Sequence, residues 1–403
     1  MKNCTLKKMF FNRFSAYVIF SILLLTNCYL GFSNILENFI KYAGFIIAFC
    51  LILIYLIDKK KNLFVNTFLV YCFCIMVSCI LGNYSNIAIF LGTYSSIIAI
   101  CIYLNFAIEY KCKSTIKVLN YLFFILILIN FFTIIIFPKG MYRTSLYSTN
   151  WFFQYDNIHM YMYFPALLVG YVNMELQGKN RFFKMIFYIE TLCILFGVIY
   201  CHSATTIVSF SVLLVYLIFR KKINSNIFFN AKNYLITYFL IFWGIVVYRL
   251  QNIFSWFIVG VLKKDLTFTT RTILWDHIIE YIKVKPFIGY GIEKTEVFRK
   301  KMMGNFFSHA HNTIYDILYK GGILALTVHI ALLIETVHSL YKNKSDDLAK
   351  IASIFFFGVL VTMNFEAREE KMGLYIILCI CFNIGKIIES GRNAKGEENE
   401  RKL

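Results

Sequence analysis

Apolar residues run along this chain in long, nearly uncharged stretches that short polar segments separate. About 20 consecutive apolar residues form a helix long enough to cross a lipid bilayer. The pattern therefore predicts an all-α polytopic membrane bundle of about 12 transmembrane helices. The predicted spans lie near residues 14–32, 39–57, 63–81, 87–106, 119–137, 158–172, 185–201, 203–219, 234–250, 322–340, 351–363 and 372–385.

Composition supports this interpretation. Hydrophobic residues make up 59% of the 403 positions and charged residues only 16%, whereas a soluble domain carries about 25% charged residues. This excludes a soluble enzyme with one anchor, a secreted disulfide scaffold and a disordered protein. The 12 cysteines fall mostly inside predicted spans and form no CxxC pair. A metal or redox framework is therefore not expected.

The net charge of +19 follows the loops between spans. Alternate loops, starting with the N-terminal segment, hold 25 of the 41 Lys and Arg residues, whereas the short loops opposite hold 5. Basic residues favour the cytoplasmic side of a membrane, so both termini are predicted to be cytoplasmic. The charge is a topology signal, and nucleic acid is not an expected partner. No small-x-small cleavage site follows the first span, so no cleavable signal peptide is expected.

These spans and loops divide the chain into four parts. The large segment between spans nine and ten is about seventy residues long, and loops of that length are usually functional or carry their own structure. It is predicted to lie outside the cytoplasm. The parts are residues 1–250 with spans one to nine and the outer loop 138–157, the large outer loop 251–321, residues 322–385 with spans ten to twelve, and the cytoplasmic tail 386–403.

The large outer loop contains a predicted amphipathic helix over Arg271–Lys283. Leu274, Trp275 and Ile278 share one side of this helix, and charged residues lie away from them. The Pro and Gly residues that follow are typical of a helix end. A second element is predicted to begin at His309 and to run into span ten.

Three features of the outer loops suggest chemistry: Arg143, Arg271, and the pair His309 and His311 with Asn312. Two arginines on separate loops could clamp a diphosphate, because a guanidinium matches phosphate oxygens bidentately. A histidine could act as a general base near neutral pH. The simpler interpretation of each arginine is that it is solvated or binds a lipid headgroup. Two histidines one residue apart, without a third ligand at a fixed spacing, are a weak signal for a zinc site.

A longer series of motif residues resembles the O-antigen ligase/polymerase family of bacterial surface-polysaccharide enzymes. The resemblance covers roughly residues 60–365, and Arg143 followed by Asn157 is similar to the outer-loop arginine and asparagine of that family. The main series is Arg271, Trp275, Pro286, Gly289, Gly291, His311-Asn312 and Gly322. Two positions depart from the pattern. Ala325 stands where the ligase pattern ends in glycine, and Ala204 follows Ser203 where many relatives have arginine.

The resemblance implies a glycosyltransferase that uses lipid-diphosphate sugars, needs neither cofactor nor metal, and lies in the cytoplasmic (inner) membrane as a multi-pass protein. The favoured function is a polymerase that moves a growing glycan from undecaprenyl diphosphate to a lipid-linked repeat unit, for O-antigen, capsule or exopolysaccharide. An O-antigen ligase acting on lipid A core is the alternative within the family. A lipid-linked oligosaccharide flippase is the alternative of another class. Expected partners are the lipid-linked donor and acceptor, membrane lipid, a chain-length regulator and a flippase.

Residue roles follow from the same resemblance. Arg143 and Arg271 are expected to hold the diphosphate, and His311 is expected to orient or deprotonate the acceptor. Asn312 is expected to fix the loop or to contact sugar, and His309 is the rival to His311 as base. The outer acidic stretch 366–370 has two open interpretations, because it could bind acceptor sugar or balance the basic loop.

Overall fold

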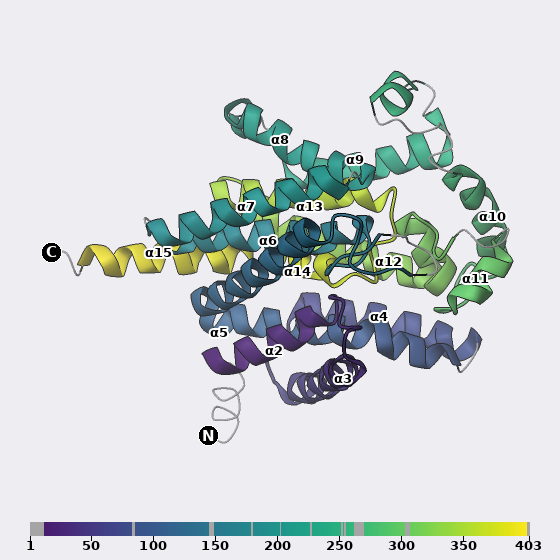
Figure 1. Cartoon of the computed structure of the whole chain (residues 1–403), viewed down its shortest axis with the longest axis horizontal. Coiled ribbons are helices and arrows are strands. Elements are labelled where there is room, and N and C mark those ends of the chain that lie inside the picture. Colours follow the sequence, from purple (N-terminus) through teal and green to yellow (C-terminus); the bar gives the residue numbers. More distant parts are fainter. Residues whose placement is uncertain are drawn as a thin grey trace.

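The computed structural model describes residues 12–82, 85–144, 149–178, 180–201, 203–225, 228–250, 253, 255–261, 270–302 and 307–400. This part of the chain is helical and contains two isolated β-bridges but no strand. The helices, drawn in Figure 1, are α2 (Arg13–Leu25), α3 (Asn34–Ile57), α4 (Leu63–Gly82), α5 (Ser85–Ile136), α6 (Asp156–Leu176), α7 (Arg181–Cys201), α8 (Ala204–Ser225), α9 (Ala231–Ile241), η1 (Phe242–Val247), η3 (Trp256–Val261), α10 (Arg271–Val284), α11 (Thr295–Lys301), α12 (Thr313–Lys342), α13 (Asp347–Met363), α14 (Met372–Phe382) and α15 (Ile384–Glu400).

The structure confirms the all-α fold and is consistent with a membrane protein. Five helices in the described part of the chain are long and apolar enough to cross a bilayer, and a sixth span results if the bent pair α14 and α15 counts as one. Every predicted span overlaps a helix. Twelve spans and their direction stay predictions, because several of these helices are shorter or less apolar than a bilayer crossing needs.

Helix α5 consists of two helical segments that meet at a sharp bend. The backbone of Lys111 leaves helical geometry, with φ −149° and ψ 55°. The Thr115 hydroxyl donates to the carbonyl oxygen of Ala107 over 3.0 Å. Residues eight apart in a straight helix are about 12 Å apart along its axis. The chain therefore turns sharply here, between the spans predicted at 87–106 and 119–137.

The helices pack side by side around a core rich in aromatic residues. Helix α12 lies against α4 and α14, α13 lies against α8 and α9, and α5, α6 and α7 pack against one another. Many large apolar side chains point outward, including Phe39, Ile46 and Phe49 on α3, as expected for a lipid-facing surface. Figure 1 shows the two termini at one end of the bundle and α10 and α11 at the other.

The predicted amphipathic helix is confirmed as α10. It buries Leu274, Trp275 and Ile278, the side that the sequence assigns to packing. Thr270 occupies the position before the helix with a left-handed backbone, and its side chain does not cap the helix. Helix α12 begins at Thr313, inside the segment predicted as the end of the outer loop.

Helix α12 breaks at Gly322, and the segment after α10 fills the break. Gly322 has φ 63° and ψ −165°, a conformation that essentially only glycine adopts. The break frees backbone groups on both sides. The Ile323 amide donates to the Pro286 carbonyl over 2.8 Å, and the Tyr290 amide donates to the Tyr319 carbonyl over 2.8 Å. These bonds satisfy groups that the helix leaves unpaired.

Glycine is required in this contact because two backbones meet closely. A Cβ atom on Gly289 would lie 2.6 Å from the Tyr319 carbonyl oxygen, and one on Gly291 would lie 2.7 Å from the Cα of Cys79. Both glycines also have positive φ. The glycines therefore allow the segment after α10 to pack against both α12 and α4. The histidine turn comes just before α12.

Candidate active site

Asn312 anchors the loop that precedes α12. Its side-chain oxygen accepts from the Tyr315 amide over 3.0 Å, so Asn312 is the N-cap of the helix. Its side-chain nitrogen donates to the Asn364 carbonyl over 3.0 Å. The side chain is fully buried. Of the two roles predicted for Asn312, these contacts support fixing the loop.

Ala310 is held from two sides, and this places the flanking histidines. The Trp275 indole donates to the Ala310 carbonyl over 2.9 Å, and the Ala310 amide donates to Asp316 over 2.8 Å. His311 has a positive φ of 48°, unusual for a residue with a side chain. The His311 amide donates to Nδ1 of His309 over 3.1 Å, and the two rings lie 4.0 Å apart. Both histidines therefore share one fixed turn.

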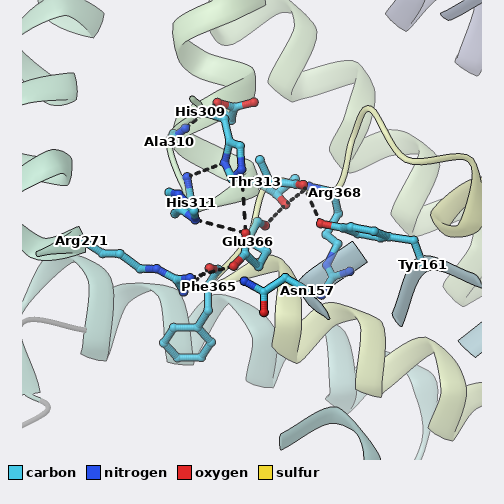
Figure 2. Close-up of polar contacts among 12 residues, drawn as sticks. Asn157, Tyr161, Arg271, His309, Ala310, His311, Thr313, Phe365, Glu366 and Arg368 are labelled. Atoms are coloured by element: carbon cyan, nitrogen blue, oxygen red, sulfur yellow. Dashed lines mark hydrogen bonds and ion pairs between the residues drawn. The ribbon is translucent and has the colours of Figure 1, made fainter. Parts of the chain in front are cut away.

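Glu366, in the segment between α13 and α14, joins the candidate residues (Figure 2). Its Oε2 lies 3.1 Å from Nδ1 of His311 and 4.0 Å from Nε2 of His309. Arg271 donates from Nη2 to Glu366 Oε1 over 2.7 Å and from Nη1 to the Phe365 carbonyl over 2.5 Å. The structure therefore brings Arg271, His309 and His311 together around one carboxylate.

The electrostatics of this cluster disfavour His309 as a base. Burial raises the pKa of Glu366, but the charges of His311 and Arg271 outweigh it and lower this pKa well below its ordinary value. Glu366 is therefore ionised and can hold the Nδ1 proton of His311, which leaves Nε2 as the acceptor. Burial, with the charge of His311, lowers the pKa of His309 well below its ordinary value, which makes His309 a poor base.

Glu366 adds a third possible metal-ligand atom to those of the two histidines. The sequence alone had not indicated such a third ligand. His309, His311 and Glu366 each offer one ligand atom, and these atoms lie within 4.8 Å of one another. Arg271 is bonded to the same carboxylate. Because a fixed guanidinium repels a metal cation at that distance, the arrangement favours Arg271 as the counter-charge of Glu366.

Arg368 is a buried cation that the sequence analysis did not single out. The Thr313 hydroxyl donates to the Glu366 carbonyl over 2.8 Å and accepts from the Arg368 amide over 3.1 Å. The Arg368 guanidinium donates to the sulfur of Met160 over 3.0 Å and lies 4.1 Å from the centre of the Tyr161 ring. Among the described residues no carboxylate lies within 4.0 Å of this guanidinium, and its buried Nε has no hydrogen-bond partner.

Asn157 and Ser203, both singled out by the family pattern, contact each other. The Ser203 hydroxyl donates to the side-chain oxygen of Asn157 over 2.5 Å. Figure 2 shows Arg271 and Arg368 approaching the Phe365–Glu366 segment from opposite sides, with Asn157 between them. His202 lies outside the described residues.

Arg143 is not brought to this cluster. Its side chain is exposed, and among the described residues it has no carboxylate partner. Its neighbours Tyr142 and Thr144 line a separate cavity of about 410 Å³, which Gln154 also lines. The diphosphate clamp of Arg143 and Arg271 stays a prediction. Sequence reasoning had a signal for Glu366, an acid in an outer loop, but no way to assign its partners.

Comparison with known proteins bears on this geometry. Residues 191–330 match the family model described as O-Antigen ligase. Over this part, about a third of its length, the chain is similar to the O-antigen ligase family. Arg271, His309, His311 and Asn312 lie within the matched range, whereas Arg143, Glu366 and Arg368 lie outside it. The resemblance stated from the motif residues is therefore confirmed as a similarity to that family.

A relative of the family is similar over part of its length. The ComP-specific O-oligosaccharyltransferase of Acinetobacter baylyi (strain ATCC 33305 / BD413 / ADP1) is 28% identical over 205 residues. The match covers 47% of this chain and 36% of the relative. The similarity thus spans about a third of that protein.

Proposed function

We propose that the protein is a glycosyltransferase that moves a glycan from a lipid diphosphate carrier to an acceptor hydroxyl, outside the cytoplasm. The observation that carries the proposal is the contact of His311 with Glu366, which Arg271 also binds. His311 and Arg271 lie within the residues that match the family model. A histidine oriented by a carboxylate beside an arginine is suited to proton transfer next to a phosphate leaving group.

In the proposed mechanism, Nε2 of His311 takes the proton of the acceptor hydroxyl. The acceptor oxygen forms a bond to the anomeric carbon, and the bond from that carbon to the diphosphate oxygen breaks. The diphosphate leaves with the electron pair. Arg271 uses two N–H groups for Glu366 and Phe365, and its remaining donors stabilise the charge that grows on the leaving group. Glu366 stabilises the imidazolium that forms on His311.

A second cation for the diphosphate has two candidates. Arg368 lies across the Phe365–Glu366 segment from Arg271 and has no carboxylate partner among the described residues. Arg143 lies on an exposed loop beside a neighbouring cavity. We infer that Arg368 strengthens the field at the leaving group, and that Arg143 contributes only if its loop moves toward the site.

The favoured reaction is polymerisation of lipid-linked repeat units from an undecaprenyl diphosphate donor. Ala325 occupies the position of the last glycine in the ligase pattern, which supports a polymerase. Ligation of finished glycan to a terminal acceptor is the second candidate, and the description of the family model favours it. Transfer to a protein is a form of this second candidate, which the name of the relative supports.

The test is a size ladder of surface and lipid-linked glycan after deletion of the gene, with complementation by wild type, His311→Ala or Arg271→Ala. A polymerase predicts surface glycan capped at one repeat unit, and a ligase predicts long glycan left on its lipid carrier. Neither variant should restore the ladder at wild-type protein levels. An unchanged ladder in the deletion strain would contradict both reactions.

A further inference from the structure

A cavity of about 330 Å³ lies beside the histidine turn and is not used by the chemistry described above. His309 lines it, and the His309 ring lies 4.0 Å from that of His311. The cavity therefore adjoins the proposed base. Its other walls combine aromatic rings with charged groups, chiefly Tyr155, Tyr161, Tyr319, Lys320, Glu369 and Glu370.

The polar wall of the cavity is a group of acids around one lysine. Lys320 on α12 lies 2.9 Å from Glu369 and 2.6 Å from Glu370, and it also pairs with Asp316. Acids outnumber bases at this wall. A wall with several carboxyl groups disfavours a diphosphate, whose charge would meet Asp316 and Glu370. It favours a neutral ligand that forms many hydrogen bonds.

Glu369 has an unused hydrogen-bonding atom in this wall. The residue is fully buried, and its Oε2 has no hydrogen-bond partner. Leaving a buried polar atom unpaired is costly, and a ligand hydroxyl would relieve that cost. Burial, together with the charge of Asp316, raises the pKa of Glu369 well above its ordinary value despite Lys320. The raised pKa favours the protonated form, in which a carboxyl group both donates and accepts.

The aromatic wall suits the same kind of ligand. A sugar ring presents hydroxyls at its edge and C–H groups on its faces, and the C–H faces pack on aromatic rings. Tyr161 and Tyr319 line the cavity from α6 and α12. Tyr319 is held by Glu293, to which its hydroxyl donates over 2.6 Å, and by stacking on Tyr290. These rings are fixed before a ligand arrives, as in preformed ligand pockets.

We propose that this cavity binds the acceptor sugar, with Glu369 and Glu370 bonding to its hydroxyls and Tyr161 packing on its ring. The proposal rests on the function proposed above. The acceptor enters beside His309, so that one hydroxyl reaches His311, whereas the donor diphosphate lies on the side of Arg271. The ligand class is a neutral hydroxylated sugar rather than an anion or a metal cation.

The experiment uses the purified full-length protein with lipid-linked repeat units extracted from the deletion strain as donor. A fluorescent repeat-unit acceptor is varied at saturating donor. Glu369→Leu, similar in size but unable to bond, is expected to raise the acceptor KM roughly tenfold or more while the donor KM stays within about twofold. Glu369→Gln is expected to retain most of the affinity, because a neutral amide also donates and accepts.

The matched control is Glu280→Leu on α10, where Glu280 is exposed and pairs with Lys283. It should leave both KM values unchanged. Glu370→Leu, at a partly exposed position, repeats the test if Glu369→Leu does not fold, and it too should raise the acceptor KM alone. An unchanged acceptor KM in a folded variant would overturn the cavity proposal.

Two binding probes separate the rival ligands. Binding of inorganic pyrophosphate that depends on Glu369 would overturn the proposal and assign the cavity to the donor. Tight Mg²⁺ binding that Glu369→Leu removes would overturn it in favour of a cation, since Asp316, Glu369 and Glu370 offer ligand atoms within 4.8 Å of one another. Absence of any transfer by the wild-type protein is a different failure, because it contradicts the proposed function itself.

Discussion

At the residue scale, the candidate chemistry depends on one carboxylate that several candidate residues share. Glu366 contacts Arg271 and His311 directly and lies 4.0 Å from His309. It thereby fixes an arginine suited to a phosphate and a histidine suited to a hydroxyl at neighbouring positions. A substitution at Glu366 should therefore disturb catalysis more than substrate binding.

Glu366→Gln tests this role. The amide keeps the shape of the side chain but removes the charge that orients the His311 ring and stabilises its protonated form. Positioned general bases contribute about 10²–10⁴-fold to rate, so kcat is expected to fall by about a hundredfold or more with a small change in KM. Turnover of extracted lipid-linked glycan by the purified variant measures this. A fall confined to KM would argue against an orienting role.

The same carboxylate predicts how stability responds to acid. The pKa of Glu366 is well below its ordinary value in the folded protein. A lowered carboxyl pKa stabilises the fold at pH values above the unfolded pKa, and this contribution is lost as pH falls through the folded pKa. Thermal unfolding in detergent should thus show a lower midpoint in acid, below about pH 4.3. The Glu366→Gln variant should show a weaker dependence there, and an equal dependence would refute this assignment.

A substitution of Arg368 is expected to affect stability and activity differently. A buried guanidinium without a carboxylate partner costs folding free energy, and replacing such a charge by an apolar side chain is often neutral or stabilising. Arg368→Met is therefore expected to keep or raise the unfolding midpoint while glycan transfer falls at least tenfold. Arg249→Met is the control, because Arg249 pairs with Asp276 on α10. A destabilised Arg368→Met protein with normal specific activity would indicate a structural role.

At the element scale, the break in α12 decides where the histidine turn lies. The segment after α10 bonds to the backbone on both sides of Gly322, so α10 and the start of α12 are joined near the break. Arg271 and Trp275 on α10 are thereby brought to the turn at residues 309–311. The glycine positions matter because only glycine permits this backbone path and this close approach.

Gly322→Ala tests the element. Its Cβ would meet the backbone of Phe287 closely, in a conformation that side chains rarely adopt. The variant is expected to lose about 1–3 kcal/mol of stability and most of its activity. Gly92→Ala on α5 is the control, because no heavy atom lies within 4 Å of its added Cβ; it should be neutral or slightly stabilising. Equal effects of both substitutions on the unfolding midpoint would contradict the argument.

At the scale of the whole molecule, the loop charges and the arrangement of the helices are consistent with one orientation in the membrane. The two termini lie at one end of the bundle and α10 and α11 at the other (Figure 1). The basic loops predict that the end with the termini is cytoplasmic. The proposed site, which uses α10 and the start of α12, is then predicted to face outward, as the proposed function requires.

Accessibility labelling tests this orientation. A cysteine introduced by Lys294→Cys, just before α11, should react in intact cells with a membrane-impermeant thiol reagent above the wild-type background. A cysteine introduced by Lys344→Cys, between α12 and α13, should react only after the cells are broken. Reaction of Lys344→Cys alone in intact cells would invert the predicted topology.

Much of the site was predictable from residue types and spacing. One stretch of the sequence contains Arg271, His309, His311 and Asn312, and the spacing of these residues can be read without knowledge of the fold. Helix α10 follows from apolar periodicity. The partners of these residues were not predictable. Glu366 lies 55 residues from His311, and nothing in the loop 364–371 shows which of its acids turns inward or that Arg368 is buried.

The sequence by itself determined the helical membrane class, the amphipathic α10 and the family resemblance, because apolar length and motif spacing are local properties of the chain. The direction in the membrane that the charge bias suggests stays a prediction. Only the tertiary structure decided that Glu366 joins Arg271 to His311, that Arg143 lies apart, and that Lys320 and three acids border a cavity. Those contacts depend on how α6, α10, α12 and the segment before α14 pack, and packing joins residues that no sequence spacing relates.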